Sequence, residues 1–386
     1  MSPIVIVGSG LAGYGLAREI RKRDAATPLT LIGADAGQVY AKPNLSNALA
    51  LGRLPEQLAS ETAAQAARRL DATILSHTRV RAIDRAGKRL LTDAGEIAYG
   101  RLVLALGADP IGHGLVGAGA ERIHAVNDLD DYARFRAALT ERNPTGKKRV
   151  AILGGGLIGC EFANDLVVAG HRVEVIHLGP WPLERLAPEA VGRALAAGLA
   201  AVGVTWRFGR AARTVEPAGA GVALVLDDGS RVEADLVLSA IGLRARTDLA
   251  RAAGLATNRG IAVDRQLRTS DPDIHAMGDC AEVDGMVLPY IQPLLAQAKT
   301  LAAVLAGEDA RLAYPAMPVV VKTAASPLVV APPPPGASGA WQAETTAKGL
   351  IARYLDADRR LLGFALGGAE TGQRLQYAQQ LPALLA

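Results

Sequence analysis

Cysteine is scarce in this 386-residue chain, which contains only Cys160 and Cys280. The two stand far apart in the sequence and form no CxxC motif, so a disulfide framework, a thiolate metal site and a redox-active cysteine pair are all disfavoured. Aromatic residues are also few, at 4% of the chain, which leaves little material for base-stacking platforms. We therefore expect no disulfide scaffold, no metal site and no nucleic-acid partner.

Long apolar runs are missing as well. The opening residues, MSPIVIVGSG, have no basic segment, and a glycine interrupts their apolar run after Val7, so they do not resemble a signal peptide. The most apolar later stretch, residues 194–204, is far shorter than the roughly 20 residues that span a bilayer. The sequence therefore predicts a soluble, cytoplasmic protein without a membrane span.

The chain is longer than one hydrophobic core usually supports, so two or three domains are expected. Half of its residues are hydrophobic and 21% are charged, which is typical of a globular enzyme. The formal net charge of +4 predicts a mildly basic surface that attracts an acidic partner or an anionic cofactor. A small excess of arginine on an ordinary surface would give the same value.

Two parts of the chain repeat one pattern, in which a buried strand is followed by a glycine-rich turn, a helix and a second strand. Near the start, residues 4–7 and 29–32 are the expected strands and residues 11–23 the helix. The same elements are expected near the middle at residues 149–153, 157–169 and 172–176. This repeat predicts two Rossmann-like βαβ units.

Further segments complete these two units. A helix is expected over residues 127–140, followed by a polar linker over residues 142–148. Two more strands, at residues 102–106 and 236–241, each end directly before a glycine.

From residue 317 onward the pattern changes to short strands. They are expected at residues 319–322, 328–330, 341–344, 350–354 and 361–366, which fits antiparallel hairpins. Residues 331–339, APPPPGASG, are expected to form an exposed connection between strands, and a polyproline ligand for another protein is the alternative.

The fold class is therefore α/β, with two Rossmann-like dinucleotide-binding domains and a small C-terminal α+β domain. We place the first domain at residues 1–113 and 245–316, the second at residues 114–244 and the third at residues 317–386.

Gly8, Gly10 and Gly13 form a GxGxxG fingerprint between the first strand and the first helix. The first glycine permits the tight turn, the second lets a pyrophosphate approach the backbone, and the third lets helix and strand pack closely. The helix N-terminus then favours the negative charge of the ligand.

An acidic residue is expected about 20 residues further on, where it would hydrogen-bond the adenosine ribose. Asp35 is the best match, with Gly33 and Ala34 between it and the strand. Alternatively, Asp35 caps the turn that follows.

Gly154, Gly156 and Gly159 repeat the fingerprint in GGGLIG. An enzyme that brings a flavin and a nicotinamide together needs two such turns, whereas a simple dehydrogenase needs one. His177 stands at the end of the second strand, with neither an acid for a 2′-hydroxyl nor an adjacent arginine for a 2′-phosphate. The choice between NADH and NADPH is therefore open, and His177 is expected to be a surface loop residue.

Gly278 and Asp279 follow another predicted strand in the motif IHAMGD. A carboxylate at this position could accept hydrogen bonds from the ribityl hydroxyls of a flavin. A glycine–aspartate pair is also common in simple turns.

With these motifs together, the chain resembles the pyridine nucleotide flavoprotein reductases that feed electrons to small iron–sulfur proteins, over essentially its whole length. The segments that carry the resemblance are VGSGLAGYGLARE from Val7, YAKPNLS from Tyr40, LVLALGADP from Leu102, NDLDDYARFR from Asn127, LGGGLIGCEFANDL from Leu153, SAIGLRARTDLA from Ser239, RTSDPDIHAMGDCAEVDG from Arg268 and MPVVVKTAASPLVVAPPPPG from Met317.

The resemblance implies FAD on the first domain and NADH on the second. The residues that it implies for holding FAD are Ser9, Gly10, Leu11, Ala12, Asp35, Lys42, Val80 and Asp279, with Ile291 and Lys322 near the isoalloxazine ring. It places Glu161 beside both the flavin and the nicotinamide, so Glu161 and Lys42 are the candidate catalytic residues.

Each of these charged residues also has a simpler interpretation. Lys42 could stabilise a pyrophosphate or a reduced flavin, or be a solvated surface lysine. Lys322 could point at an anion or extend outward into solvent. Glu161 could lie in the first helical turn, where the helix dipole favours an acid.

One departure from the family bears on Glu161. Relatives often carry a lysine just after the LS of the loop that contains Lys42, whereas Asn47 follows Ser46 here. An ion pair with Glu161 is therefore expected to use Lys42.

The resemblance implies an enzyme that transfers a hydride from NADH to FAD and single electrons onward to rubredoxin, a small acidic iron protein. Without a cysteine pair, transfer to the partner would be direct, and docking would be electrostatic and transient. The alternatives are a ferredoxin or a flavorubredoxin as acceptor, or a redox sensor that binds FAD and NADH without turnover.

Overall fold

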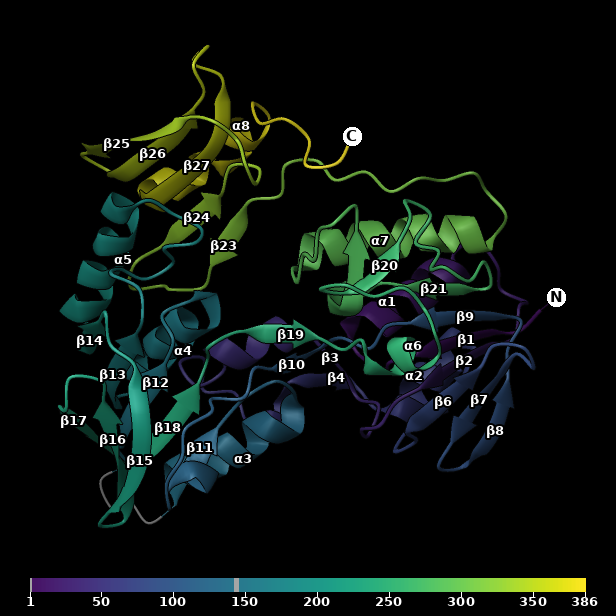
Figure 1. Cartoon of the computed structure of the whole chain (residues 1–386), viewed down its shortest axis with the longest axis horizontal. Helices are drawn as coiled ribbons and strands as arrows, with labels where there is room; N and C mark the ends of the chain where they lie inside the picture. Colours follow the sequence, from purple (N-terminus) through teal and green to yellow (C-terminus); the bar gives the residue numbers. More distant parts are fainter. Residues whose placement is uncertain (1, 142–145) are drawn as a thin grey trace.

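The computed structural model describes residues 2–141 and 146–386. Figure 1 shows two α/β units side by side, with a smaller unit over the second one. Of the predicted linker over residues 142–148, residues 142–145 lie outside the described part. Among the described helices, none combines the length and the apolar character needed to cross a membrane.

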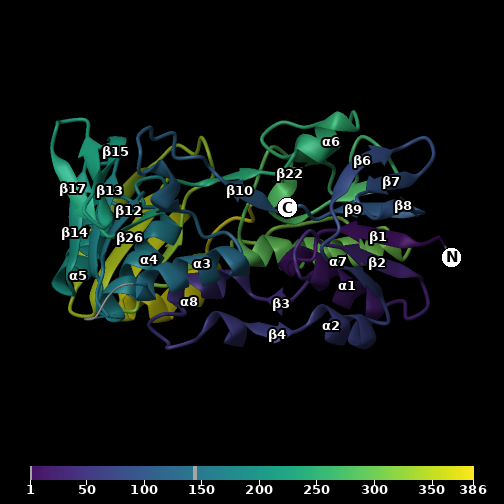
Figure 2. The same ribbon diagram turned by 90° about the horizontal axis from the view of Figure 1, so that it is seen from below.

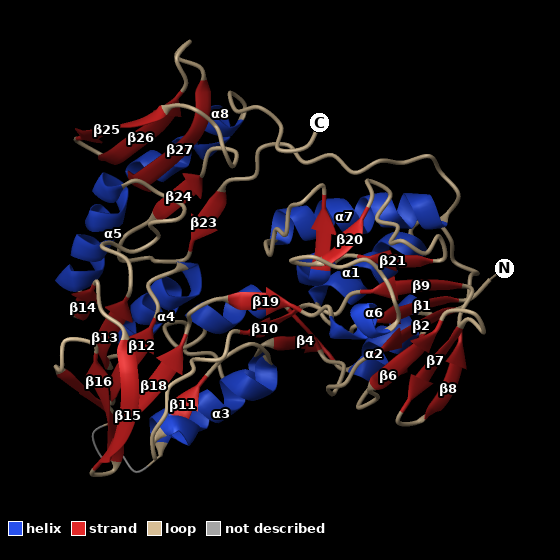
Figure 3. Ribbon diagram, viewed as in Figure 1, coloured by secondary structure: helices blue, strands red, loops and turns tan. Residues whose placement is uncertain are grey.

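The first unit is built on a five-stranded sheet in the order β21-β9-β1-β2-β5, and every neighbouring pair is parallel. The strands are β21 (Ile274–Ala276), β9 (Arg101–Leu104), β1 (Ile4–Val7), β2 (Leu29–Ile32) and β5 (Thr73–Leu75). All four residues of β1 are buried, as expected of a central parallel strand. Helix α1 (Leu11–Arg21) packs against α7 (Ile291–Leu305) above this sheet (Figure 3).

The second unit repeats this architecture with the parallel order β11-β18-β12-β13-β14. Its strands are β11 (Ile123–His124), β18 (Leu236–Ser239), β12 (Arg149–Leu153), β13 (Arg172–His177) and β14 (Val204–Phe208), and its helices are α3 (Leu129–Thr140), α4 (Leu157–Val168) and α5 (Glu189–Ala201). Phe135 of α3 and Phe162 of α4 meet edge to face in its core. The predicted repeat is thereby confirmed, and each predicted central helix ends one or two residues early.

Smaller elements surround the two sheets. In the first unit they are β3 (Val39–Tyr40), β4 (Ala59–Glu61), α2 (Ala63–Leu70), the hairpin strands β6 (Val80–Asp84), β7 (Arg89–Thr92) and β8 (Gly95–Ala98), α6 (Asp248–Ala252), β20 (Ile261–Val263) and β22 (Ala281–Val283). In the second they are β15 (Ala212–Ala218), β16 (Gly221–Leu226) and β17 (Arg231–Ala234). Sequence patterns had assigned none of these hairpins.

The chain passes between the two units twice, through an antiparallel pair of short strands. They are β10 (Ala108–Pro110) and β19 (Leu243–Ala245). The crossings lie close to the predicted domain boundaries after residues 113 and 244, and they support those boundaries, which remain a proposal.

The C-terminal unit is an antiparallel sheet in the order β23-β24-β27-β26-β25, followed by the short helix α8 (Arg374–Ala378). Its strands are β23 (Val319–Val321), β24 (Leu328–Ala331), β25 (Ala340–Thr346), β26 (Gly349–Leu355) and β27 (Leu361–Gly368). The predicted α+β domain with hairpins is confirmed. Residues 332–339 connect β24 to β25, whereas Ala331, predicted to belong to this connection, is the buried last residue of β24. Figure 2 shows this sheet beside α4 and α5.

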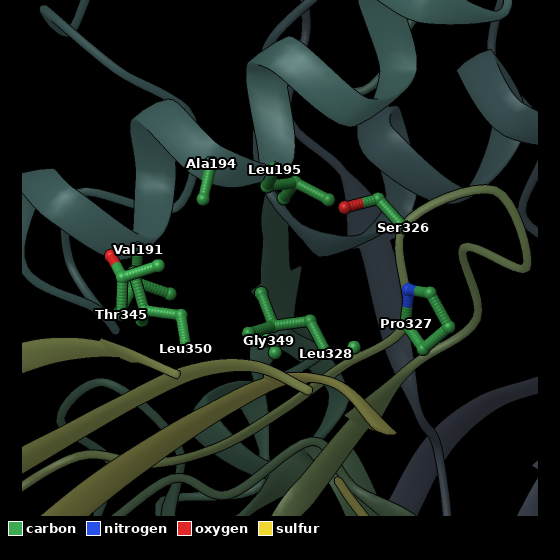
Figure 4. A pocket seen from close by; sticks show the side chains of 11 residues that line it. Val191, Ala194, Leu195, Ser326, Pro327, Leu328, Thr345, Gly349 and Leu350 are labelled. Carbon is green, nitrogen blue, oxygen red and sulfur yellow. The ribbon is translucent and has the colours of Figure 1, made fainter. Parts of the chain in front are cut away.

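The C-terminal sheet packs on α5 and leaves a small hollow between them. Its volume is about 230 Å³. Figure 4 shows Val191, Ala194 and Leu195 of α5 facing Leu328, Leu350 and Ser326 across it. The contact is mostly apolar, so burying it stabilises the packing of the C-terminal sheet on α5.

The chain returns to the first unit after the C-terminal sheet. Buried Tyr314, just before the sheet, donates its backbone N–H to the carbonyl of Leu385 at 2.8 Å and accepts from the N–H of Leu384 at 2.8 Å. Gln297 of α7 holds the Tyr314 hydroxyl at 2.6 Å. Both ends of the C-terminal unit are therefore anchored at the same place.

Helix α4 of the second unit forms hydrogen bonds with both the first unit and the C-terminal unit. Asp165 is fully buried and accepts from the backbone N–H groups of Leu49 and Ala50 at 3.1 and 2.7 Å. Asn164 accepts from the N–H of Ala325 in the C-terminal unit at 3.0 Å. Burial raises the pKa of Asp165 to about 6, although the two N–H donors oppose that rise.

His275 is buried in β21, and neither of its ring nitrogens has a hydrogen-bond partner among the described residues. The pKa of His275 is lowered to about 4, chiefly by burial and also by the positive charges of Arg101 and Arg268. Because this pKa lies below the ordinary 6.5, His275 is protonated in the unfolded chain but not in the folded chain at pH values between about 4 and 6.5. His275 therefore destabilises the folded chain progressively as the pH falls from 6.5 towards 4.

We expect His275→Phe to raise the free energy of unfolding by roughly 1 kcal/mol near neutral pH, because an unpartnered buried polar group is removed. This gain should grow by about 1 kcal/mol on going down to about pH 5.5, since a tenfold change in proton affinity corresponds to about 1.4 kcal/mol. Urea unfolding at the two pH values measures both quantities.

His275→Leu separates charge from packing. A different side-chain volume changes the stability near neutral pH, but the pH dependence should match that of the phenylalanine variant. A pH dependence equal to that of the parent chain in both variants would contradict this account.

Candidate active site

The first glycine-rich turn brings backbone against backbone at two of its glycines. A Cβ on Gly8, whose φ is +131°, would lie 2.1 Å from the carbonyl oxygen of Ala105, and one on Gly13 would lie 1.9 Å from that of Gly8. Around Gly10, in contrast, there is open space within 4 Å. Gly10 is the N-cap of α1 and makes no side-chain capping bond. The uncapped N–H groups of this helix therefore face a space that a ligand can enter.

Asp35 lies beside this turn. Its Oδ1 accepts from the Ser9 hydroxyl at 2.8 Å and from the N–H of Gly37 at 2.9 Å. A Cβ on Gly33 would collide with Ser9 Oγ at 2.0 Å, while Ala34 is exposed. Asp35 thus caps the following turn, as the alternative interpretation held, and it still lies next to the fingerprint.

The second turn repeats the same geometry. A Cβ on Gly154, at φ +103°, would lie 2.6 Å from the carbonyl oxygen of Ala240, and one on Gly159 would lie 1.9 Å from that of Gly154. Gly156, the uncapped N-cap of α4, again faces open space. Two equivalent cradles that a side chain would fill are thus present, which fits two dinucleotides.

The short 3-10 helix η4 (Gly278–Cys280) lies against the start of α1. A Cβ on Gly278 would lie 3.0 Å from that of Ala12, and the Gly278 N–H donates to Gln297 Oε1 at 2.6 Å. The carboxylate of Asp279 makes no hydrogen bond within the described residues. Burial raises its pKa, and nearby Lys42 opposes the rise. Such a carboxylate is free to accept from hydroxyl groups of a ligand.

Lys42 begins the 3-10 helix η1 (Lys42–Asn47), and it is not a solvated surface lysine. Its Nζ donates to Asn127 Oδ1 at 2.5 Å, and Asn127 Nδ2 donates to the carbonyl of Ala108 at 3.0 Å. Burial lowers the pKa of Lys42, and the charge of Asp279 raises it in part. The structure thus brings Lys42 and Asp279 together.

Glu161 forms its ion pair with Lys322, so the expected pair with Lys42 is wrong. Lys322 Nζ contacts Glu161 Oε2, and the Lys322 N–H donates to Oε1 at 3.1 Å. The Ser46 hydroxyl donates to Oε2 at 2.6 Å. These residues come from the first unit, the second unit and the C-terminal unit, and we call them the Ser46–Glu161–Lys322 cluster.

The alternative interpretations of Glu161 and Lys322 are also wrong. Glu161 lies beyond the first turn of α4 and is buried. The helix dipole, which favours acids in the first turn, therefore does not account for its position. Lys322 folds inward onto Glu161 instead of extending into solvent.

The remaining predicted residues lie at the edges of the first unit. Val80 begins β6, and Ile291 is a half-exposed residue at the first position of α7. Ser46 and Asn127 were not proposed as site residues. Both stand inside family motifs, but no spacing in the sequence links Ser46 to Glu161 or Asn127 to Lys42.

His177 is not the surface loop residue that the sequence suggested. It is buried at the end of β13, because its ring packs beside the second turn and accepts from the N–H of Gly155 at 3.0 Å through Nδ1. Its Nε2 lies 2.8 Å from Glu184 Oε2.

Both cysteines are buried and unpaired. Burial raises the pKa of Cys160, and it raises the pKa of Cys280 to about 11, so neither is a reactive thiolate. No group of three or more His, Cys, Asp or Glu residues suited to a metal ion occurs in residues 2–141 and 146–386.

Comparisons with known proteins agree with this architecture. A family model described as pyridine nucleotide-disulphide oxidoreductase matches residues 2–303, and one described as rubredoxin binding C-terminal domain matches residues 311–381. The rubredoxin-NAD(+) reductase of Alcanivorax borkumensis is 45% identical over 386 residues, which is all of both chains. The nitric oxide reductase FlRd-NAD(+) reductase of Aeromonas hydrophila is 38% identical, covering 98% of this chain and 96% of its own.

Among solved structures, putidaredoxin reductase in its covalent complex with putidaredoxin superimposes with a TM-score of 0.88 at 27% identity. The match covers 99% of this chain and 94% of that one. The resemblance seen in the sequence motifs is confirmed: the chain belongs to the pyridine nucleotide-disulphide oxidoreductase family and carries a rubredoxin-binding C-terminal domain.

Proposed function

We propose that this chain is an NADH-dependent flavoprotein reductase, a rubredoxin-NAD(+) reductase, that acts in the cytoplasm. The observation that carries the proposal is the pair of equivalent glycine cradles in a chain whose last unit matches a rubredoxin-binding domain. Full-length similarity to a rubredoxin-NAD(+) reductase at 45% identity supports it.

FAD belongs to the first cradle. The N–H groups at the start of α1 would hold its pyrophosphate, and Asp35 would hold the adenosine ribose, since only its Oδ1 is occupied, by Ser9 and Gly37. Asp279 accepts from ribityl hydroxyls, and Lys42 supplies the positive charge beside it. Val80 and Ile291 are the apolar residues that we place against the cofactor.

NADH belongs to the second cradle, where the start of α4 binds its pyrophosphate. Bound FAD supplies the ability to accept a hydride from the nicotinamide and to release electrons one at a time. The chain positions the two rings. Glu161 is held on both oxygens by Ser46 and Lys322, so its carboxylate has a fixed position.

A second candidate is a reductase of the rubredoxin-like centre of a flavorubredoxin. The 38% identity to the reductase of Aeromonas hydrophila favours it. Both candidates share the same site and differ only in the acceptor.

The acceptor experiment measures NADH oxidation with rubredoxin, with flavorubredoxin and with a ferredoxin over a range of salt. We expect rubredoxin to give the highest kcat/KM, and this value to fall several-fold as salt rises, because exposed charges are screened beyond a Debye length of about 8–10 Å. A small neutral quinone as acceptor is the control and should show no such fall. A preference for ferredoxin would overturn the acceptor assignment, and flavin that is not bleached by NADH would point to a sensor.

The two cradles can be tested separately. Gly10→Val should remove FAD while leaving the fold intact, because a Cβ added at Gly10 meets no protein atom within 4 Å and stands where we place the ligand. Gly156→Val should keep FAD and weaken NADH binding by about 100-fold or more, a cost of about 3 kcal/mol. FAD content per chain and NADH titration measure these effects.

Gly112→Ala is the control, because Gly112 also faces open space but lies outside both turns. Retention of a full complement of FAD by Gly10→Val would contradict the assignment of the first cradle.

The Ser46–Glu161–Lys322 cluster predicts that Lys322, and not Lys42, stabilises the fold through Glu161. Lys322→Met should lower the free energy of unfolding by roughly 1–3 kcal/mol, because it leaves the buried carboxylate of Glu161 unpaired, and the partial exposure of Lys322 limits the loss. Glu161→Gln in the same chain should recover part of it. Urea unfolding of the single and double variants gives the coupling energy.

Lys42→Met is the matched comparison and should show no coupling to Glu161→Gln. Coupling of Glu161 to Lys42 instead of Lys322 would reject the arrangement described here.

A further inference from the structure

The second cradle lacks the acidic residue that usually selects between nicotinamide coenzymes. In Rossmann units an acid near the end of the second strand accepts from the ribose 2′-hydroxyl of NAD, whereas an arginine there binds the 2′-phosphate of NADP. In the first unit Asp35 follows β2 in this way. In the second unit β13 ends at His177.

The structure supplies an acid at this position from further along the chain. Because His177 Nδ1 accepts from the N–H of Gly155, the proton of the neutral ring is on Nε2. Nε2 then donates to Glu184 Oε2 at 2.8 Å, with the carbonyl of Trp181 at 3.1 Å. His177 thus connects the glycine-rich turn directly to the carboxylate of Glu184.

The loop over residues 178–188 is folded so that Glu184 stays beside this turn. The N–H of Leu183 donates to the carbonyl of Gly155 at 3.0 Å, and buried Leu183 has a φ of +61°, which such residues rarely adopt. A Cβ on Gly179 would lie 2.8 Å from both Glu184 Cδ and His177 Nε2. The packing around Glu184 therefore leaves little freedom for its carboxylate to move.

The Glu184 carboxylate can still receive a ligand. Its side chain is 28% exposed, and Oε1 has no hydrogen-bond partner within the described parts of the chain. Nearby Arg210 is paired with Asp228 at 2.6 Å, whereas the exposed Arg185 has no ion pair among the described residues. A free carboxylate oxygen accepts from a hydroxyl group and repels a phosphate.

We propose that Glu184, positioned by His177, is the residue that makes this chain prefer NADH to NADPH. The inference rests on the proposed function, since it assigns the nicotinamide coenzyme to the second cradle. Glu184 would accept from the 2′-hydroxyl through Oε1 and disfavour a 2′-phosphate at the same place.

The test measures dissociation constants of NAD⁺ and NADP⁺ for the FAD-loaded protein by calorimetry, which requires no turnover. The parent should bind NAD⁺ more tightly. Glu184→Gln should reduce the ratio of the two constants by about tenfold or more, equivalent to about 1.4 kcal/mol. Glu189→Gln is the matched control, because Glu189 is an exposed acid of the same unit paired with Arg193, and it should leave the ratio unchanged.

A rescue variant tests the geometry independently. His177→Asp combined with Glu184→Gln places a carboxylate directly at the end of β13 and should restore the preference for NAD⁺. An unchanged ratio in Glu184→Gln, or tighter binding of NADP⁺ by the parent through Arg185, would overturn the assignment of Glu184. A parent that bound neither nucleotide would overturn the proposed function itself.

Discussion

The buried carboxylate of Glu161 needs hydrogen-bond and ion-pair partners from the protein, because water does not solvate it. The arrangement of the three units depends on which residues supply those partners. Burying an unpaired charge costs several kcal/mol. Two residues offset this cost for Glu161 on α4. Ser46 of the first unit donates a hydrogen bond to it, and Lys322 of the C-terminal unit forms an ion pair and a backbone hydrogen bond with it. Asn164 and Asp165, one turn further along the helix, bind the backbones of the same two units. Because residues three and four apart share a helix face, a single stripe of α4 positions all three parts of the chain.

The features that the sequence predicted well are those that local geometry determines. A strand buried on both faces favours a run of β-branched residues. The first turn requires glycine at position 13, because a Cβ there would collide with the carbonyl oxygen of Gly8. The two βαβ units, both cradles and the antiparallel C-terminal sheet were accordingly predicted with boundaries close to those observed. The sequence also predicted that Asp35 lies close to the first turn, because only one helix and one strand separate the two in the chain.

The features that the sequence did not predict are contacts between distant segments. Lys322 and Glu161 are separated by nearly half of the chain, and only the docking of the C-terminal unit brings them together, so Lys42 was the nearer choice and the wrong one. His177 appeared to be a loop residue because a histidine at a strand end carries no pattern that reveals burial. Its hydrogen-bond partners come from two separate segments: the N–H of Gly155 from the second glycine-rich turn, and the carboxylate of Glu184 from the folded loop over residues 178–188.

The anchoring of Tyr314 to Leu384 and Leu385 has a consequence for how the C-terminal unit is held. Because the chain leaves and re-enters the first unit at one point, this unit is a closed loop suspended from a single attachment. Connectivity therefore does not determine its orientation. That orientation depends on the apolar contact with α5 and on the hydrogen bonds to α4, which belong to the other unit. The unit that matches a rubredoxin-binding domain is thus tethered to the first unit but aligned by the second, so its position depends on how those two units are arranged.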